Sequence, residues 1–439
     1  MDYNRFISSY YRGEKKGNYM IRKMALLAET VPEAVDLTSG MPSWDTFPIS
    51  SATFKCKNGT TLELSEDEMK DITPYQSSQG MTELLTWIRK FHEKYHSPPL
   101  MDNENSERRF DICVTPGAMG AMSVLFPIIM ERNDVVLLEE FNYPGTTNNI
   151  DKVSAYPIEL SMDEFGVKPD ALVDAIVNWK QKAIESGAPN PDDLNPPKVF
   201  YTVPIGHNPT GIVVPLQRKK EIYKIAQKYN LLIVEDDPYF YFQYDEIFTP
   251  SYQSIDVDGR VIRIDSMAKF FAPGLRIGWV TGPSKIIRTV IPAQVSATIA
   301  PGAFAQIAVL KLFGKTGMVG FQDRIQELKN FYKPKRDLSV SLLKKHLKDD
   351  VEWIEPQAGI FLWMKLKNLS DSMIFIDSED CRKYGVFVVP GAGFLVRPKG
   401  PCPYLRISFT RMSTEDLEKG IICLSQWIKD ATRKELSGI

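Results

Sequence analysis

Short apolar runs and helix-like stretches alternate through the middle of this 439-residue chain. Each apolar run is only four or five residues long, which suits strands buried on both faces of a mainly parallel sheet. Helical spacing of apolar residues marks the stretches at 118–130 and 217–230. This alternation predicts a doubly wound α/β domain. The expected strands are residues 112–115, 134–138, 198–202, 231–234, 260–264 and 276–280.

The pattern changes after about residue 320. A charged helical stretch over residues 321–348 precedes several short strands and a closing helix, which indicates a smaller α+β domain. We therefore expect three parts: an N-terminal segment (1–45) that joins the small domain, a large domain (46–320) and a small C-terminal domain (321–439). The short strands are expected near 351–354, 359–365, 386–389 and 404–408.

Charge and hydropathy narrow the class of partner. The 53 basic and 55 acidic residues leave a formal net charge of −2, so the chain has no electrostatic footprint for nucleic acid. No apolar run approaches the roughly 20 residues that a membrane span needs. We expect a small-molecule partner, with no nucleic acid and no membrane. The N-terminus lacks a signal peptide's apolar core, which predicts a cytoplasmic location, with mitochondria as the alternative.

Cysteine and histidine give little sign of a metal. The five cysteines are scattered and form no C-x-x-C pair, so neither a disulfide framework nor a zinc site is predicted. His92 and His96 lie four residues apart on an expected helix and would share one face. Because no third ligand accompanies them, we favour a solvated helix face over a metal site.

One segment combines groups that suit a cofactor with an aldehyde and a phosphate. Residues 266–278, SMAKFFAPGLRIG, begin where an expected strand ends. A lysine there would lie at the mouth of the sheet, where α/β folds bind ligands. Arg276 follows Lys269 by seven residues, beyond a Pro-Gly turn that could fold its guanidinium back towards the amine.

This segment resembles the pyridoxal 5′-phosphate (PLP) lysine signature of class I/II aminotransferases, which have the fold type I architecture. Three further segments resemble the same family in the family's order. They are YTVPIGHNPTG at 201–211, VEDDPY at 234–239 and YLRISF at 404–409.

Further segments are similar to the kynurenine/α-aminoadipate aminotransferase branch and its fungal aromatic relatives. The similarity extends over nearly the whole chain. These segments are Ile21-Arg22, GMP at 40–42, YQSSQG at 75–80 and VVPG at 388–391.

The resemblance implies roles for the residues that contact the cofactor ring. Lys269 would bond to the PLP aldehyde and, once a substrate amine displaces it, become the catalytic base. Asp236 would pair with the protonated pyridine nitrogen; it is preferred to Asp237 because only Asp236 satisfies D-x-x-Y with Tyr239. Asn208 and Tyr239 would hydrogen-bond the phenolic oxygen. Tyr143 would stack on the ring.

The phosphate and the substrate have their own implied residues. Arg276, Ser266 and the backbone N–H groups of Ala118 and Met119 would bind the phosphate at the start of a helix. The α-carboxylate would be clamped by Arg406, with Asn208, Gly40 and Arg22 near the substrate. Tyr75 resembles the tyrosine that this family contributes from the neighbouring subunit, so a homodimer is implied.

Two departures from the family pattern concern the phosphate. Ala268 stands where the family often has serine, and Ala118 and Met119 stand where hydroxyl and amide side chains are usual. Each lost charge-assisted hydrogen bond costs roughly 1.5–3 kcal/mol. We therefore expect weaker PLP retention than in the family at large.

The resemblance predicts an aminotransferase that moves an amino group from an aromatic, kynurenine-like or aminoadipate-like amino acid to a 2-oxo acid such as 2-oxoglutarate. The alternative is a PLP-dependent lyase or decarboxylase of a specialised pathway, because the sequence does not show which bond of the substrate Cα is oriented for cleavage. A transcription regulator with an aminotransferase-like domain is not expected, since the similarity begins near Arg22 and leaves no room for a helix-turn-helix.

Overall fold

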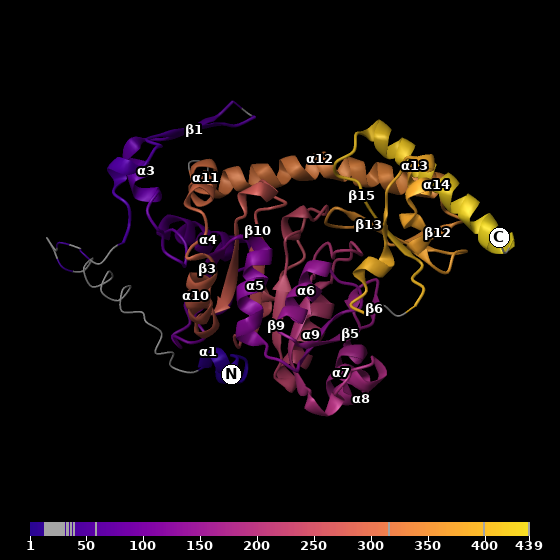
Figure 1. The fold of residues 1–439 in the computed structure, drawn as a ribbon, viewed down its shortest axis with the longest axis horizontal. Helices are drawn as coiled ribbons and strands as arrows, with labels where there is room; N and C mark the ends of the chain where they lie inside the picture. Colours follow the sequence, from indigo (N-terminus) through magenta and orange to yellow (C-terminus); the bar gives the residue numbers. More distant parts are fainter. Residues whose placement is uncertain are drawn as a thin grey trace.

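The computed structural model describes residues 1–12, 31, 35, 37, 40–57, 59–314, 317–397 and 400–437. A seven-stranded sheet forms the centre of the molecule (Figure 1). The antiparallel strand β11 separates β3 from the others, and the remaining neighbours pair in parallel. In spatial order the strands are β3 (Phe110–Thr115), β11 (Gly278–Pro283), β10 (Val261–Ser266), β9 (Leu232–Asp236), β8 (Asn195–Thr202), β4 (Asp134–Glu139) and β5 (Tyr156–Leu160).

Both faces of this sheet are covered, as the short apolar runs predict. Along β4, Val136 and Leu138 join one buried cluster, whereas Val135 and Leu137 join another on the opposite face. Successive strand residues point to opposite faces, so a strand buried on both sides reads as continuously apolar. The covering helices are α4 (Thr82–Tyr95), α5 (Gly117–Ile129), α6 (Pro144–Lys152), α7 (Pro169–Val177), α8 (Trp179–Glu185), α9 (Leu216–Tyr229), α10 (Ser284–Thr298) and α11 (Ala303–Gly314).

A second, four-stranded antiparallel sheet follows in the C-terminal part of the chain. The long helix α12 (Gly317–His346) runs from the large sheet to this smaller one (Figure 1). The smaller sheet and its helices enclose their own apolar cluster, which includes Leu362, Leu405 and Trp427. The remaining elements are β12 (Val351–Trp353), β13 (Phe361–Leu366), β15 (Tyr404–Ser408), β14 (Val389–Pro390), α13 (Ser378–Tyr384) and α14 (Thr414–Ser437).

The start of the chain differs from the expectation that residues 1–45 join the small domain. The apolar side chains of Tyr3, Phe6 and Ile7 are buried in the cluster of the large sheet, and the Tyr3 hydroxyl donates to the Gly259 carbonyl at 2.9 Å. For residues 1–12 the expected placement is therefore wrong. These residues include α1 (Ser9–Arg12) and the 3₁₀ turn η1 (Tyr3–Arg5).

A hairpin of β1 and β2, followed by α3, extends away from the large sheet (Figure 1). No described helix is long and apolar enough to cross a membrane. The hairpin and its helix are β1 (Ala52–Lys55), β2 (Thr61–Leu64) and α3 (Glu66–Ile72). A separate two-stranded sheet is formed by β6 (Met162–Asp163) and β7 (Gly166–Val167). The other 3₁₀ turns are η2 (Trp44–Thr46), η3 (Pro191–Asp193), η4 (Phe240–Phe242), η5 (Gln253–Ile255), η6 (Pro273–Leu275), η7 (Ser372–Ile376) and η8 (Gly391–Phe394).

Candidate active site

The carboxyl ends of three neighbouring strands deliver most of the expected site residues to one edge of the large sheet. Asp236 ends β9, Ser266 ends β10, and Asn208 lies in the loop after β8. Because these strands are parallel, their ends meet at the same edge, where α/β sheets bind ligands. Strand β15 of the smaller sheet brings Arg406 to the same place, since Arg406 contacts Asn208.

Lys269 follows the end of β10 and presents its amine in a cationic setting. Partial desolvation, followed by the positive charges of Arg406 and Arg276, lowers the pKa of Lys269. A lowered pKa increases the fraction of neutral amine, which is the form that attacks a carbonyl. The sequence placed this lysine at a strand end, and the structure places two cations where they favour its neutral form.

Arg276 lies over the first turn of α5. Its Nη2 donates to the Pro116 carbonyl at 3.2 Å, and a Cβ built on Gly117 would lie only 2.5 Å from that nitrogen. Gly117 also has a φ of +76°, so glycine is required here both for space and for backbone conformation. The guanidinium and the N-terminal N–H groups of α5, including those of Ala118 and Met119, thus form a cradle for an anion.

The two adjacent aspartates at the end of β9 have different partners. The Asp237 carboxylate accepts from Arg263 at 2.9 Å. Asp236 Oδ2 accepts from the Tyr201 hydroxyl at 2.7 Å, while buried Asp236 Oδ1 has no partner among the described residues. Asp237 Oδ1 is likewise without a partner among the described residues, so the two aspartates differ in that Asp237 pairs with a cation and Asp236 does not. The choice of Asp236 as the partner of the ring nitrogen stays a prediction.

Arg406 is held by groups that leave part of its fork unused. Its Nη1 donates to Asn208 Oδ1 at 2.8 Å, and its guanidinium carbon lies 4.2 and 4.6 Å from the ring centroids of Phe361 and Phe394. The buried Nε has no partner within the described residues. A planar, aromatic-backed guanidinium with an unused N–H suits a ligand carboxylate.

Two tyrosines complete the described site. The Tyr239 side chain is buried, and burial raises its pKa, with the Asp236 carboxylate adding to the shift. Tyr143 precedes α6 and is 41% exposed. A Cβ on Gly145 would lie 2.4 Å from the Tyr143 ring and 2.8 Å from Met119 Sδ, so this ring packs beside Met119. Met119 thereby supports an aromatic side chain where the family pattern has a polar one.

Three expected residues are not brought into contact with these groups. Tyr75 is 72% exposed in the stretch between α3 and α4. Gly40 is exposed, and a Cβ added to it would meet nothing within 4 Å. Arg22 lies outside the described residues. The roles expected for these three therefore stay predictions.

Sequence reasoning missed residues that support the site from behind. Tyr201 is fully buried and bonds to both Asp236 and Thr146. Glu139 accepts from the Val203 N–H at 3.0 Å and from Asn142 Nδ2 at 3.2 Å, and burial raises the pKa of Glu139 to about 7. A tyrosine inside an apolar strand looks like core, so its sequence position gives no signal. The sequence position of Glu139 did give a signal, because a carboxylate at the end of a buried strand needs hydrogen-bond partners.

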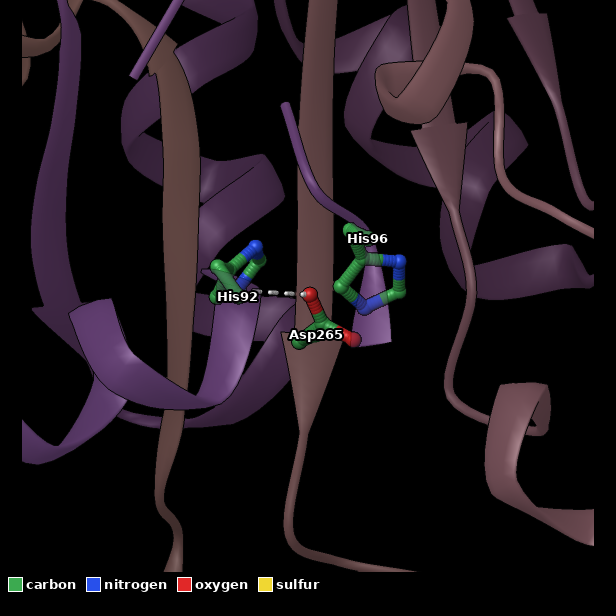
Figure 2. A group of neighbouring side chains, drawn as sticks. All are labelled: His92, His96 and Asp265. Atoms are coloured by element: carbon green, nitrogen blue, oxygen red, sulfur yellow. Dashed lines mark ion pairs between the residues drawn. The ribbon is translucent and has the colours of Figure 1, made fainter. Parts of the chain in front are cut away.

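His92 and His96 differ from the expected solvated face, because both are fully buried beside Asp265 (Figure 2). Their ligand atoms lie within 4.8 Å of one another, a spacing that fits a metal. Burial, with the nearby charge of Arg263, lowers the pKa of His92 to about 3. The 3.6 Å contact between His92 Nε2 and Asp265 is therefore made by a neutral ring.

The hydrogen bonds of this trio occupy the nitrogens that a metal would need. His92 Nε2 accepts from the Trp279 indole at 2.9 Å, and its Nδ1 contacts the Gln253 amide oxygen. His96 contacts Ser251 and Tyr241 through its two nitrogens, both at 3.0 Å. Asp265 also accepts two hydrogen bonds from the Arg263 guanidinium, at 2.8 and 2.9 Å. The trio is a hydrogen-bonded layer behind the site, as expected for satisfied buried polar groups.

The donor set at the sheet edge fits PLP. Lys269 offers an amine to an aldehyde, and Asp236 Oδ1 is an unused buried acceptor for a protonated ring nitrogen. The cradle of Arg276 over Gly117 offers cation and N–H groups to a phosphate.

The chain is similar to known proteins over nearly its whole length. A family model described as aminotransferase class I and II matches residues 33–422. The mitochondrial kynurenine/alpha-aminoadipate aminotransferase of Bos taurus is 37% identical over 433 residues, covering 98% of this chain and 100% of the relative. The crystal structure of aminotransferase Aro8 from Candida albicans has a TM-score of 0.84 and 24% identity, covering 98% of this chain and 99% of the other.

A further solved structure contains a form of the cofactor. The kynurenine aminotransferase of Pyrococcus horikoshii, crystallised with PMP, has a TM-score of 0.73 and 26% identity, covering 98% of each chain. The fold type I architecture expected from the sequence is confirmed by these likenesses and by the large, mostly parallel sheet.

Proposed function

Because the chain belongs to the class I and II aminotransferase family, and so is a PLP-dependent aminotransferase, we propose that it acts on aromatic, kynurenine-like or aminoadipate-like amino acids. The amino group would pass to a 2-oxo acid such as 2-oxoglutarate. Arg406 supports this reading most directly. Its aromatic-backed guanidinium keeps Nε unused, and two successive substrates would share this anchor because both have an α-carboxylate.

When bound, PLP supplies an aldehyde for the substrate amino group and a cationic ring that accepts the electron pair of the substrate Cα. Lys269 Nζ would take the proton from the substrate Cα and carry it to the carbon that came from the cofactor's aldehyde. Asp236 Oδ1 would accept from the ring N–H. Asn208 and Tyr239 would donate to the ring oxygen, and Tyr143 would cover the ring face. Arg406 orients the substrate by its carboxylate.

The phosphate would be held by Arg276, by Ser266 and by the N–H groups of Ala118 and Met119. Ser266 Oγ already accepts from the Ala268 N–H at 3.1 Å, so its hydroxyl is fixed near Lys269. Ala268 itself offers no hydroxyl. This absence supports the proposal that PLP is retained less firmly than in the family at large.

Restoring the missing hydroxyl tests this proposal. Ala268→Ser is expected to tighten PLP binding by roughly tenfold, because one added hydrogen bond to a charged group contributes about 1.5 kcal/mol or more. The PLP dissociation constant of the apoprotein would be measured by fluorescence quenching. Ala188→Ser, on the loop before η3, is the control and should leave the constant unchanged. Equal affinity of Ala268→Ser and the unaltered protein would contradict the proposal.

The homodimer is proposed with Tyr75 reaching the partner's site. Tyr75 is exposed within its own chain, which leaves its ring free to contact a second copy. Mixing a Lys269→Ala chain with a Tyr75→Ala chain tests this, because a mixed dimer regains one intact site. Activity should return to about a quarter of that of the unaltered protein at an equal mixture. Two variants that stay as inactive together as apart would contradict the shared site.

Single amino acids added to the purified holoenzyme test the reaction type. Conversion of the bound cofactor to its pyridoxamine form, reversed by 2-oxoglutarate, is expected for kynurenine, aromatic amino acids or aminoadipate, and absorption spectroscopy would follow it. Release of ammonia or carbon dioxide without that conversion would instead support the lyase or decarboxylase alternative. The comparisons do not favour that alternative, since the relatives are named as aminotransferases.

The division into an N-terminal segment, a large domain (46–320) and a small domain (321–439) remains part of the proposal, with residues 1–12 reassigned to the large sheet. The cytoplasm is the proposed location. Mitochondria are the alternative, supported by the basic N-terminal stretch and by the mitochondrial name of the Bos taurus relative.

A further inference from the structure

A chain of hydrogen bonds runs from α6 through β8 to the site. Thr146 Oγ1 lies 3.0 Å from the Tyr201 hydroxyl, which donates to Asp236 Oδ2 at 2.7 Å. Since the Tyr201 proton is used on Asp236, its oxygen is free to accept the Thr146 proton. Thr146 and Tyr201 are fully buried and Asp236 is 6% exposed. With Tyr201 donating to Asp236, the Thr146 hydroxyl has two acceptors, the Tyr201 oxygen at 3.0 Å and Met122 Sδ at 3.8 Å, and the chain ends on a carboxylate.

Asp236 receives no direct contact from a cation among the described residues. Arg263 on β10 bonds to Asp237 and Asp265; the Asp265 charge raises the pKa of Asp236, and the Arg263 charge lowers it. The charge of Asp236 in turn raises the pKa of the Tyr239 hydroxyl. Burial raises the pKa of Asp236 to about 6, and the Tyr201 bond opposes this rise. The Tyr201 hydroxyl is thus the one side-chain donor that the described structure gives to this carboxylate.

We propose that Tyr201, supported by Thr146, is a positioning residue that keeps the shared proton on the cofactor ring nitrogen rather than on Asp236. The inference rests on the proposed function, because it takes Asp236 as the partner of that nitrogen. Tyr201 Oη binds Oδ2, and Oδ1 has no partner among the described residues, so Oδ1 is available to the ring N–H. A carboxylate that already accepts one hydrogen bond has a lower proton affinity, which favours the cationic ring.

The pH dependence of pyridoxamine 5′-phosphate (PMP) binding to the apoprotein tests the inference. PMP has no aldehyde, so Lys269 forms no covalent bond to it. Its protonated ring requires ionised Asp236, so affinity should fall as pH falls through the pKa of Asp236. Tyr201→Phe removes the donor and raises that pKa, so the fall should begin roughly one pH unit higher than in the unaltered protein. At low pH the variant should bind PMP about tenfold more weakly.

Graded and matched variants separate this role from simple packing. Thr146→Val should raise the pH midpoint of PMP binding by less than Tyr201→Phe does. Thr146→Ser keeps the hydroxyl, so its midpoint should equal that of the unaltered protein. Tyr223→Phe is the control, because Tyr223 also donates to carboxylates, those of Asp256 and Asp258, but near the opposite ends of the strands. It should leave the midpoint unchanged.

The outcomes distinguish the inference from its premise. A higher midpoint for Tyr201→Phe, with the Thr146 series in the expected order, supports the inference. Curves that stay parallel at every pH would show that Tyr201 only packs, and would overturn it while leaving the proposed function intact. If the unaltered apoprotein fails to bind PMP at all, the proposed function is overturned and the inference with it.

Discussion

Replacing Lys269 with alanine is expected to remove covalent PLP binding and to slow proton transfer at the substrate Cα by roughly 10²- to 10⁴-fold. The reason is that one amine both bonds to the aldehyde and moves the proton. Single-turnover rates with an amino acid measure the second role. Borohydride reduction followed by mass spectrometry measures the first, since it should attach PLP permanently to the unaltered chain and not to the variant.

Two controls keep this result specific to the amine. Lys285→Ala removes a half-buried lysine on α10 that pairs with Glu107, and should change neither measurement. A small primary amine added to Lys269→Ala should partly restore the proton-transfer rate, because the cavity left by the lysine side chain admits a free base. A Lys269→Ala protein that still traps PLP upon reduction would show that another lysine is the anchor.

The strand-end residues could be predicted from the sequence because their positions follow from the fold. Asp236 and Ser266 end short apolar runs, and parallel strands bring such ends to one edge. The same logic located Lys269. Their hydrogen-bond partners could not be predicted in this way. Tyr201 lies in an apolar strand 35 residues before Asp236, and nothing in the sequence pairs the two.

The burial of His92 and His96 had a signal that the spacing argument did not use. Leu84, Ile88, His92 and His96 form one i, i+4 row along α4, and the two apolar members identify that row as the buried face. The histidines extend it because Gln253, Ser251, Tyr241 and Trp279 satisfy their nitrogens. The row of side chains along the helix therefore predicts that the histidines are buried. Their hydrogen-bond partners cannot be predicted in the same way, because they lie on distant segments of the chain.

Replacing Arg406 with lysine is expected to lower kcat/KM for both the amino acid and the 2-oxo acid by roughly 10²- to 10³-fold. The substitution removes one or two hydrogen bonds to a charged group, and each contributes about 1.5–3 kcal/mol. Lysine keeps the charge but loses the planar fork that contacts Asn208 while facing Phe361 and Phe394. Each half-reaction would be measured separately under pre-steady-state conditions.

Comparison of the two half-reactions makes the test of Arg406 sharper than a loss of overall activity. The α-carboxylate is the group that both substrates share, so Arg406→Lys should impair both half-reactions by similar factors. Arg411→Lys changes an exposed arginine beyond the end of the same strand and should impair neither. If only one substrate is affected by Arg406→Lys, then Arg406 binds a side chain rather than the shared carboxylate, and the single-anchor reading of the site is wrong.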